Sequence, residues 1–132
     1  MKVLLDTDIV SYLFRAGDER ALGRFKAYAP GEVAISAITA AELMFGAELS
    51  GAPRHRVMVD RICRALLVAP FEAVAARAYG TLRAALHRRG TPIGSNDMLI
   101  AAHAIALGIP LATNNLREFR RVPGLKVDNW LG

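Results

Sequence analysis

The sequence predicts an α/β fold of three layers, α/β/α, with a parallel sheet of about five strands between the helices. Short apolar runs typical of buried strands alternate along the chain with longer stretches of helical periodicity. This alternation is typical of parallel strands that are joined by right-handed helical crossovers. The 132 residues contain no repeat, low-complexity tract or linker. We therefore expect one domain over residues 1–132.

The first half of the chain begins with the apolar run 3–5, which ends abruptly at Asp6. Such a run is typical of a buried strand that delivers a carboxylate to the ligand-binding edge of a sheet. The small-residue run 33–36 predicts a second strand. Capping residues and apolar spacing predict helices at residues 9–14, 18–29, 39–49 and 54–64.

The second half predicts strands at residues 66–68, 111–113 and around 126–127. Its longest helical signal covers 72–89 and contains Gly80, where we expect close packing or a bend, because glycine costs a helix about 1 kcal/mol relative to alanine. Ser95 is expected to cap a helix at 96–107. A short helix is expected near Glu118 and Phe119.

Charge and composition narrow the class of protein. The formal charge is +5, from 17 basic and 12 acidic residues, and a basic surface attracts polyanions such as nucleic acid. Charge alone leaves open whether the surface binds nucleic acid or is merely basic. No apolar stretch approaches the roughly 20 residues of a membrane span, and Asp6 and Asp8 interrupt any signal peptide. A single cysteine also fits a reducing compartment, so we expect a cytoplasmic protein without membrane attachment.

Three acidic residues share one local setting. Asp6, Glu42 and Asp97 each lie at a predicted strand exit or near the start of a predicted helix. Since parallel strands end at the same edge of a sheet, we expect the three carboxylates to meet there. Oxygen ligands suit Mg²⁺ or Mn²⁺, and such a metal activates water and polarises a phosphate. Two or three carboxylates around one metal are a common design for phosphoryl transfer.

Each acid also has a structural explanation. Asp6 or Asp8 could cap the helix that follows. The spacing of Thr39 and Glu42 matches a capping box, which accounts for a glutamate by itself. Asp97 in a first turn gains about 0.3–1 kcal/mol from the helix dipole without any metal. Spacing alone leaves these alternatives open.

Six segments occur in order along the chain: LDTD at residues 5–8, ISAITAAEL at 35–43, GAE at 46–48, GTPIG at 90–94, DMLIAAHA at 97–104 and TNNLREF at 113–119. On these segments the sequence resembles the PIN-domain ribonucleases, and specifically the VapC toxins of bacterial toxin–antitoxin pairs. Together the six segments span nearly the whole chain. The resemblance implies a PIN-like domain and an endoribonuclease that requires Mg²⁺ or Mn²⁺ and inhibits translation.

The resemblance also implies partners. It predicts a cognate VapB-type antitoxin, a homodimer, and a heterotetramer or larger complex of toxin with antitoxin. The Thr-Asn-Asn-x-Arg-Glu-Phe segment looks like that of a subgroup which includes toxins that cut initiator tRNA in the anticodon loop. RNA is therefore the expected substrate, with tRNA as a lead.

Asp6, Glu42 and Asp97 match three of the four acidic positions of this family. At the fourth, where an aspartate is common, the chain has Asn115. An asparagine supplies no charge, but it can orient a water ligand or touch a phosphate. Its presence keeps open a second hypothesis, a catalytically weak PIN module that acts by forming complexes.

Supporting roles are expected around the acids. Thr7 and Thr113 offer hydroxyls that can hold carboxylates in place. Asp8 replaces a more usual asparagine, and either restores charge or caps a helix. Five arginines flank the predicted site loops and could hold RNA phosphates or form a solvated basic face: Arg88, Arg89, Arg117, Arg120 and Arg121.

A phosphoacceptor, receiver-like signalling domain is the alternative from another class. It is also a small α/β fold with an acidic metal pocket, and Asp6, Asp8 and Lys126 superficially suit it. However, the predicted third strand ends at residues 68–70 without the aspartate that would accept a phosphoryl group. Glu42 and Asp97 would also have no role in it.

Overall fold

The computed structural model describes residues 1–132 and contains one five-stranded sheet in the order β3-β2-β1-β4-β5. Every neighbouring pair of strands is parallel. The strands are β1 (Val3–Leu5), β2 (Val33–Ser36), β3 (Leu67–Ala69), β4 (Leu111–Ala112) and β5 (Val127–Asp128). The predicted parallel sheet of about five strands is confirmed.

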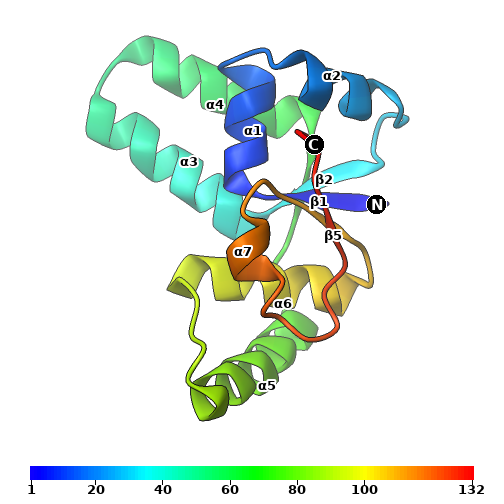
Figure 1. The fold of residues 1–132 in the computed structure, drawn as a ribbon. Helices are drawn as coiled ribbons and strands as arrows, with labels where there is room; N and C mark the ends of the chain where they lie inside the picture. Colours follow the sequence, from blue (N-terminus) through cyan, green and yellow to red (C-terminus); the bar gives the residue numbers. More distant parts are fainter.

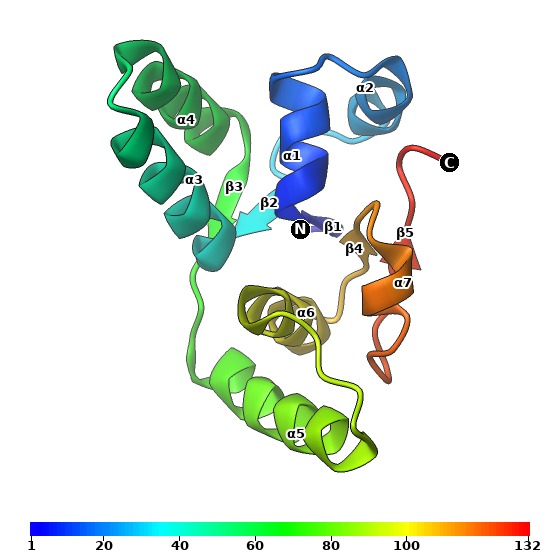
Figure 2. The same cartoon turned by 60° about the vertical axis from the view of Figure 1, so that its left-hand side comes forward.

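Helices cover both faces of this sheet, as Figures 1 and 2 show. They are α1 (Thr7–Phe14), α2 (Glu19–Lys26), α3 (Ala37–Ser50), α4 (Pro53–Ala65), α5 (Ala73–Arg89), α6 (Ser95–Leu107) and α7 (Leu116–Phe119). Helices α1, α2 and α4 contribute to the core on one face, and α5, α6 and α7 to the core on the other. The three-layer α/β/α prediction is therefore confirmed.

The central strand β1 shows why the apolar run at its position is continuous. Val3 and Leu5 pack into one core, and Leu4 between them packs into the other. All three side chains are fully buried. A strand that is covered by helices on both faces has no solvent-facing side, so its residues do not alternate with polar ones.

The ends of the central strands set the position of the polar residues that follow. Leu5 pairs with Ile35 of β2 and with Ala112 of β4. The next residues along the three strands are Asp6, Ser36 and Thr113, which therefore lie side by side at one edge. The backbone N–H of Asp6 also donates to the Ala112 carbonyl, at 2.9 Å.

Two predicted helix caps differ from the structure. Helix α3 follows β2 directly, and Ser36 caps it by accepting the N–H of Ile38 at 3.0 Å. Thr39 lies inside the helix and is fully buried, so the predicted capping box of Thr39 and Glu42 is wrong. Helix α6 begins at Ser95 with Gly94 as its N-cap and no side-chain cap, so the predicted Ser95 cap is also wrong.

The expectation of close packing at Gly80 is wrong as well. Gly80 is exposed, and a Cβ placed on it would meet nothing within 4 Å. Helix α5 continues unbroken from Ala73 to Arg89. None of the helices has the length and apolar content that crossing a membrane requires.

Candidate functional site

Asp6 lies where β1 ends and α1 begins, and both of its carboxylate oxygens accept hydrogen bonds. Oδ1 accepts the backbone N–H of Thr7 at 2.8 Å, which makes Asp6 the N-cap of α1. Oδ2 accepts the hydroxyl of Thr113 at 3.0 Å. Asp6 is only 4% exposed. A carboxylate oxygen has lone pairs beyond those used here, so Asp6 is fixed in place and still able to bind a cation.

Asp8 does not have the capping role that was the alternative for it. The cap of α1 is Asp6, and Asp8 lies exposed in the first turn of the helix. Its negative charge acts at a distance, because it helps to raise the pKa of Asp6. The predicted helix cap at Asp8 is therefore wrong, while its contribution of charge near the acids agrees with the other alternative.

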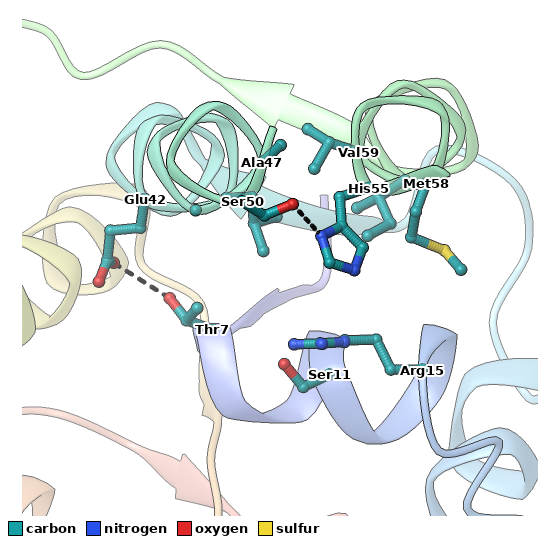
Figure 3. Close-up of a pocket in the computed structure, with 12 residues that line it drawn as sticks. Thr7, Ser11, Arg15, Glu42, Ala47, Ser50, His55, Met58 and Val59 are labelled. Carbon is teal, nitrogen blue, oxygen red and sulfur yellow. Dashed lines mark hydrogen bonds between the residues drawn. The ribbon is translucent and has the colours of Figure 1, made fainter. Parts of the chain in front are cut away.

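Glu42 projects from α3 towards the start of α1. Its Oε1 accepts the hydroxyl of Thr7 at 3.1 Å, and the same hydroxyl lies 3.4 Å from Oγ1 of Thr39. Figure 3 shows the Thr7 and Glu42 side chains pointing towards each other. Glu42 does not cap α3, so capping does not explain why a glutamate occupies this position. Thr7 holds the carboxylate beside the end of β1.

Asp97 lies in the first turn of α6 and meets an acid that the sequence pattern did not indicate. Glu118 of α7 accepts the backbone N–H of Gly94 at 2.7 Å. A Cβ on Gly94 would lie 3.3 Å from Oδ2 of Asp97 and 3.8 Å from Oε1 of Glu118. The missing side chain of Gly94 thus leaves room for both carboxylates.

Asn115 positions Glu118. Its amide Nδ2 donates to Oε2 of Glu118 at 2.7 Å, and its own backbone N–H donates to Oγ1 of Thr113 at 2.9 Å. Thr113 is fully buried and in turn donates to Asp6. A short chain of hydrogen bonds therefore connects the fourth acid to the first, with Asn115 between them.

The electrostatics show that these carboxylates share one environment. Burial raises the pKa of Asp6 to about 6, with smaller contributions from the charges of Asp8 and Glu42. Burial raises the pKa of Asp97 to about 7, and the charges of Asp6, Glu118 and Glu42 add to the effect. The pKa of Glu118 is instead lowered, chiefly by its hydrogen bond from Gly94. Below about pH 7, Asp97 therefore holds a proton beside an ionised Glu118.

The structure thus places Asp6, Glu42 and Asp97 around one edge of the sheet and adds Glu118. No group of three or more His, Cys, Asp or Glu side chains is arranged to hold a metal ion as the structure stands. The donor chemistry still fits a hard cation, since all four groups are carboxylates and two of them have raised pKa values. Mg²⁺ keeps several of its waters when bound, so the acids need not all contact it directly.

The predicted arginines separate into two groups. Arg117, Arg120 and Arg121 lie on or next to α7 and are exposed; the charge of Arg121 also contributes to the lowered pKa of Glu118. Arg88 and Arg89 are exposed at the end of α5, where Arg89 lines a separate groove with Val74. The first group thus flanks Glu118 along the chain, and the second lies on another helix.

A groove of about 410 Å³ extends from Thr7 and Glu42 between α1, α3 and α4. Figure 3 shows Ser11 of α1, Arg15 just after α1 and His55 of α4 pointing into it. The imidazole Nδ1 of His55 is hydrogen-bonded to the Ser50 hydroxyl. A molecule bound in this groove would reach the Glu42 carboxylate.

Glu118 is the residue of the site that sequence reasoning missed. It comes three positions after Asn115, a spacing that places two side chains on the same face of a helix. The helix that carries it, α7, has only four residues. Such a short element has no periodicity that would identify its inward face. In addition, the residue at the position of the fourth family acid is Asn115, not Glu118.

Comparisons with known proteins agree with this geometry. Residues 3–125 match the PIN domain family. The chain is 39% identical over 132 residues to Ribonuclease VapC2 of Haemophilus influenzae, covering 99% of both. It is also 39% identical over 131 residues to the tRNA(fMet)-specific endonuclease VapC of Salmonella typhimurium, covering 98% of both.

Solved structures of VapBC proteins are also similar to this chain. A VapBC structure from Salmonella typhimurium bound to DNA has a TM-score of 0.93 at 39% identity, with 98% of both chains covered. A VapBC2 structure from Rickettsia felis, bound to a DNA fragment from its promoter, has a TM-score of 0.88 at 34% identity, with 98% of this chain and 99% of that one covered.

Proposed function

Because the chain belongs to the PIN-domain family, and within it to the VapC ribonucleases, we propose that it is the toxin of a type II toxin–antitoxin system and cleaves RNA by metal-dependent hydrolysis. One observation carries this proposal: the carboxylates of Asp6, Glu42, Asp97 and Glu118 lie close enough to perturb one another, two having raised pKa values.

In this proposal Asp6 and Asp97 bind Mg²⁺ or Mn²⁺ directly, and Glu42 either binds the ion or orients the attacking water. Glu118 supplies the fourth negative charge. When bound, the ion draws in the phosphate, polarises it and makes a water easier to deprotonate. An ion also allows a phosphodiester to approach carboxylates that would otherwise repel it.

The neighbouring side chains hold the acids for this task. Thr113 fixes Asp6, and Thr7 fixes Glu42. Gly94 and Asn115 fix Glu118. Because the pKa of Asp97 is raised to about 7, a cation bound to the ionised carboxylate would displace the proton that Asp97 holds below this pH. The hydrogen bonds keep the carboxylates in place while their charge state changes.

We propose an initiator tRNA as the substrate. The relatives from Salmonella typhimurium and Shigella flexneri are named tRNA(fMet)-specific endonucleases, and the chain is 39% and 37% identical to them over 98% of its length. Cleavage of this tRNA would stop translation, which accounts for toxicity. The cytoplasm is where such a substrate would be met.

We further propose a VapB-type antitoxin as the partner, with the toxin as a homodimer inside a heterotetramer or larger complex. The support is that the similar solved structures from Rickettsia felis, Salmonella typhimurium and Haemophilus influenzae are VapBC structures. The alternative of a receiver-like domain has no support from the family match. The alternative of a catalytically weak module rested on Asn115, and Glu118 now supplies the charge that Asn115 lacks.

The proposal is tested by mapping new RNA ends after the purified toxin acts on total RNA with Mg²⁺. We expect ends concentrated in the anticodon loop of initiator tRNA, no new ends in EDTA, and none with Asp6→Asn at the same concentration. The asparagine retains an oxygen that can cap α1, so the variant should fold. Equal cleavage by wild type and Asp6→Asn, or cleavage that persists in EDTA, would contradict the proposal.

A further inference from the structure

A buried histidine in α6 has no part in the proposed mechanism. His103 is 1% exposed, and its Nδ1 lies 2.8 Å from Oγ of Ser36, which is fully buried. The ring of Phe71 packs edge-on against the imidazole, with 5.2 Å between the ring centroids. A serine and a histidine at this distance resemble a nucleophilic pair, but burial of both keeps substrate away from the hydroxyl. The bond must serve the protein itself.

The hydrogen-bonding pattern indicates how the pair is protonated. Oγ of Ser36 already accepts the backbone N–H of Ile38, so its hydroxyl proton is free to be donated to Nδ1 of His103. The imidazole is then neutral, and burial accordingly lowers the pKa of His103, while a hydrogen bond to the Pro70 carbonyl acts in the opposite direction. Nε2 is buried and makes no hydrogen bond of good geometry.

The unpaired Nε2 makes histidine an unfavourable choice for packing alone. A buried polar group that lacks a partner destabilises the fold, whereas an apolar side chain of similar size would not. Aliphatic side chains such as Leu86 and Ile100 fill the core on the face of the sheet that α6 covers. The gain that remains for histidine at this position is the hydrogen bond to Ser36.

That bond joins the two helices that carry acids of the site. Ser36 is the N-cap of α3, and Glu42 follows it by six residues. His103 lies on α6, six residues after Asp97. In Figure 2 the start of α3 lies above α6, at the edge of the sheet where β2 ends. A lock between Ser36 and His103 therefore fixes the start of α3 relative to α6.

We propose that His103 is a positioning residue, which through its hydrogen bond to Ser36 sets the spacing between Glu42 and Asp97 for cation binding. This inference rests on the proposed function, because it assigns His103 a task at the same carboxylates. It adds a residue that touches neither cation nor RNA.

The test compares three variants of the full chain: His103→Leu, His103→Asn and Leu86→Ala. Leucine removes the acceptor. The side-chain oxygen of asparagine can take the place of Nδ1 and accept from Ser36, although asparagine fills less of the core. Leu86→Ala is the control for lost stability, because it destabilises the core on the α5 and α6 face of the sheet without touching the Ser36 bond. The readouts are Mn²⁺ affinity by calorimetry, kcat and KM for RNA cleavage, and thermal stability.

We expect His103→Leu to weaken Mn²⁺ binding and lower kcat by about 10-fold, as loss of a supporting hydrogen bond near a metal site commonly does, with little change in KM. His103→Asn should recover most of the Mn²⁺ affinity and most of kcat, despite lower stability. Leu86→Ala should lose stability alone. Wild-type values in His103→Leu, or no recovery in a folded His103→Asn, would overturn the inference.

Mn²⁺ affinity separates this inference from the proposed ribonuclease. A wild-type protein that binds Mn²⁺ but cuts no RNA would contradict the proposed function, while the affinities of the variants would still decide the role of His103. A folded wild-type protein that binds no divalent cation would overturn both.

Discussion

Asp6 has two tasks at once. As the N-cap of α1 it stabilises a helix, and capping is usually a sufficient reason for an aspartate. Its burial and its bond from Thr113 are more than a cap requires. Burial also raises its pKa to about 6, with the charges of Asp8 and Glu42 adding to the effect. The metal-free protein therefore keeps a carboxylate at a position that disfavours its charge.

This position predicts an unusual pH dependence of stability. Because the pKa of Asp6 rises from 3.8 to about 6 on folding, the folded protein binds more protons than the unfolded chain between those values. The free energy of unfolding of the metal-free protein should thus fall as pH rises from about 4 to 7, by up to about 3 kcal/mol from Asp6. The raised pKa of Asp97 acts in the same direction, and the lowered pKa of Glu118 in the opposite one.

Urea unfolding at a series of pH values in EDTA measures this dependence. Asp6→Asn has no proton to lose at that position, so its stability should fall less over the same range. Saturating Mg²⁺ should remove most of the decline in the wild-type protein by binding the ionised form. A stability that increases from pH 5 to pH 7 in EDTA would contradict the electrostatic description of Asp6.

At the scale of the elements, the ends of β1 and β2 were predictable, and the caps of α3 and α6 were not. The apolar run before Asp6 and the small-residue run 33–36 predicted where β1 and β2 end, whereas β4 was expected to include Thr113 and ends at Ala112. The start of α3 was misplaced because β2 leads into it without a loop, so Thr39 resembled a cap while Ser36 is the cap. Glu118 was missed because α7 is too short to show a helical period.

Gly94, at the start of α6, contacts two acids of the site. It is the N-cap of α6, its N–H holds Glu118, and its missing Cβ leaves room for Asp97. Gly94→Ala keeps the N–H and suits the observed φ of −54°. The added carbon would push the Asp97 carboxylate, so we expect kcat for RNA cleavage to fall by roughly tenfold, since small misplacements of this kind are costly.

Gly80→Ala is the matched control for this change. Its Cβ would enter open space on α5, so it should raise the free energy of unfolding by about 1 kcal/mol and leave cleavage unchanged. Gly94→Ala should alter stability by less than about 1 kcal/mol, the range expected for a changed N-cap. Unchanged kinetics in Gly94→Ala would show that the room beside Asp97 is not needed.

At the scale of the whole molecule, the fold class followed from the alternation of apolar runs and helical stretches. Parallel strands buried on both faces produce the continuous run at 3–5, which is a strong signal. The basic character of the chain was equally visible, with a formal charge of +5. The distribution of the basic residues over the surface was not predictable from the sequence, because the distance between an arginine and the acids depends on tertiary packing. The structure places Arg117 and Arg120 on or beside α7, near Glu118, and Arg88 at the end of α5.

This separation predicts which arginines bind RNA. The double change Arg117→Ala and Arg120→Ala should weaken RNA binding by a catalytically inactive Asp6→Asn protein. It should also reduce the dependence of log K on log[salt] by about 0.7 for each RNA phosphate that an arginine no longer neutralises. Arg88→Ala in the same background is the control and should change neither quantity. An equal effect of Arg88→Ala would indicate a diffuse basic surface instead of a path beside α7.

The central claim is that the carboxylates act on a bound cation, and Glu42 tests it most directly. The measurement is the initial rate of RNA cleavage across a Mg²⁺ titration for wild type, Glu42→Gln and Glu48→Gln. Glu48 is the matched control, since it lies exposed on the same helix and pairs with Arg56. Glutamine keeps the size of Glu42 and an oxygen for the Thr7 hydroxyl, so Glu42→Gln should melt within a few degrees of wild type.

We predict that Glu48→Gln cleaves like wild type at every Mg²⁺ concentration, while Glu42→Gln loses at least about 100-fold in rate, as removal of a group that acts in the transition state does. Excess Mg²⁺ should not restore it if Glu42 orients the attacking water, and should restore part of it if Glu42 binds the ion. Cleavage by a folded Glu42→Gln at the wild-type rate throughout the titration would contradict the account.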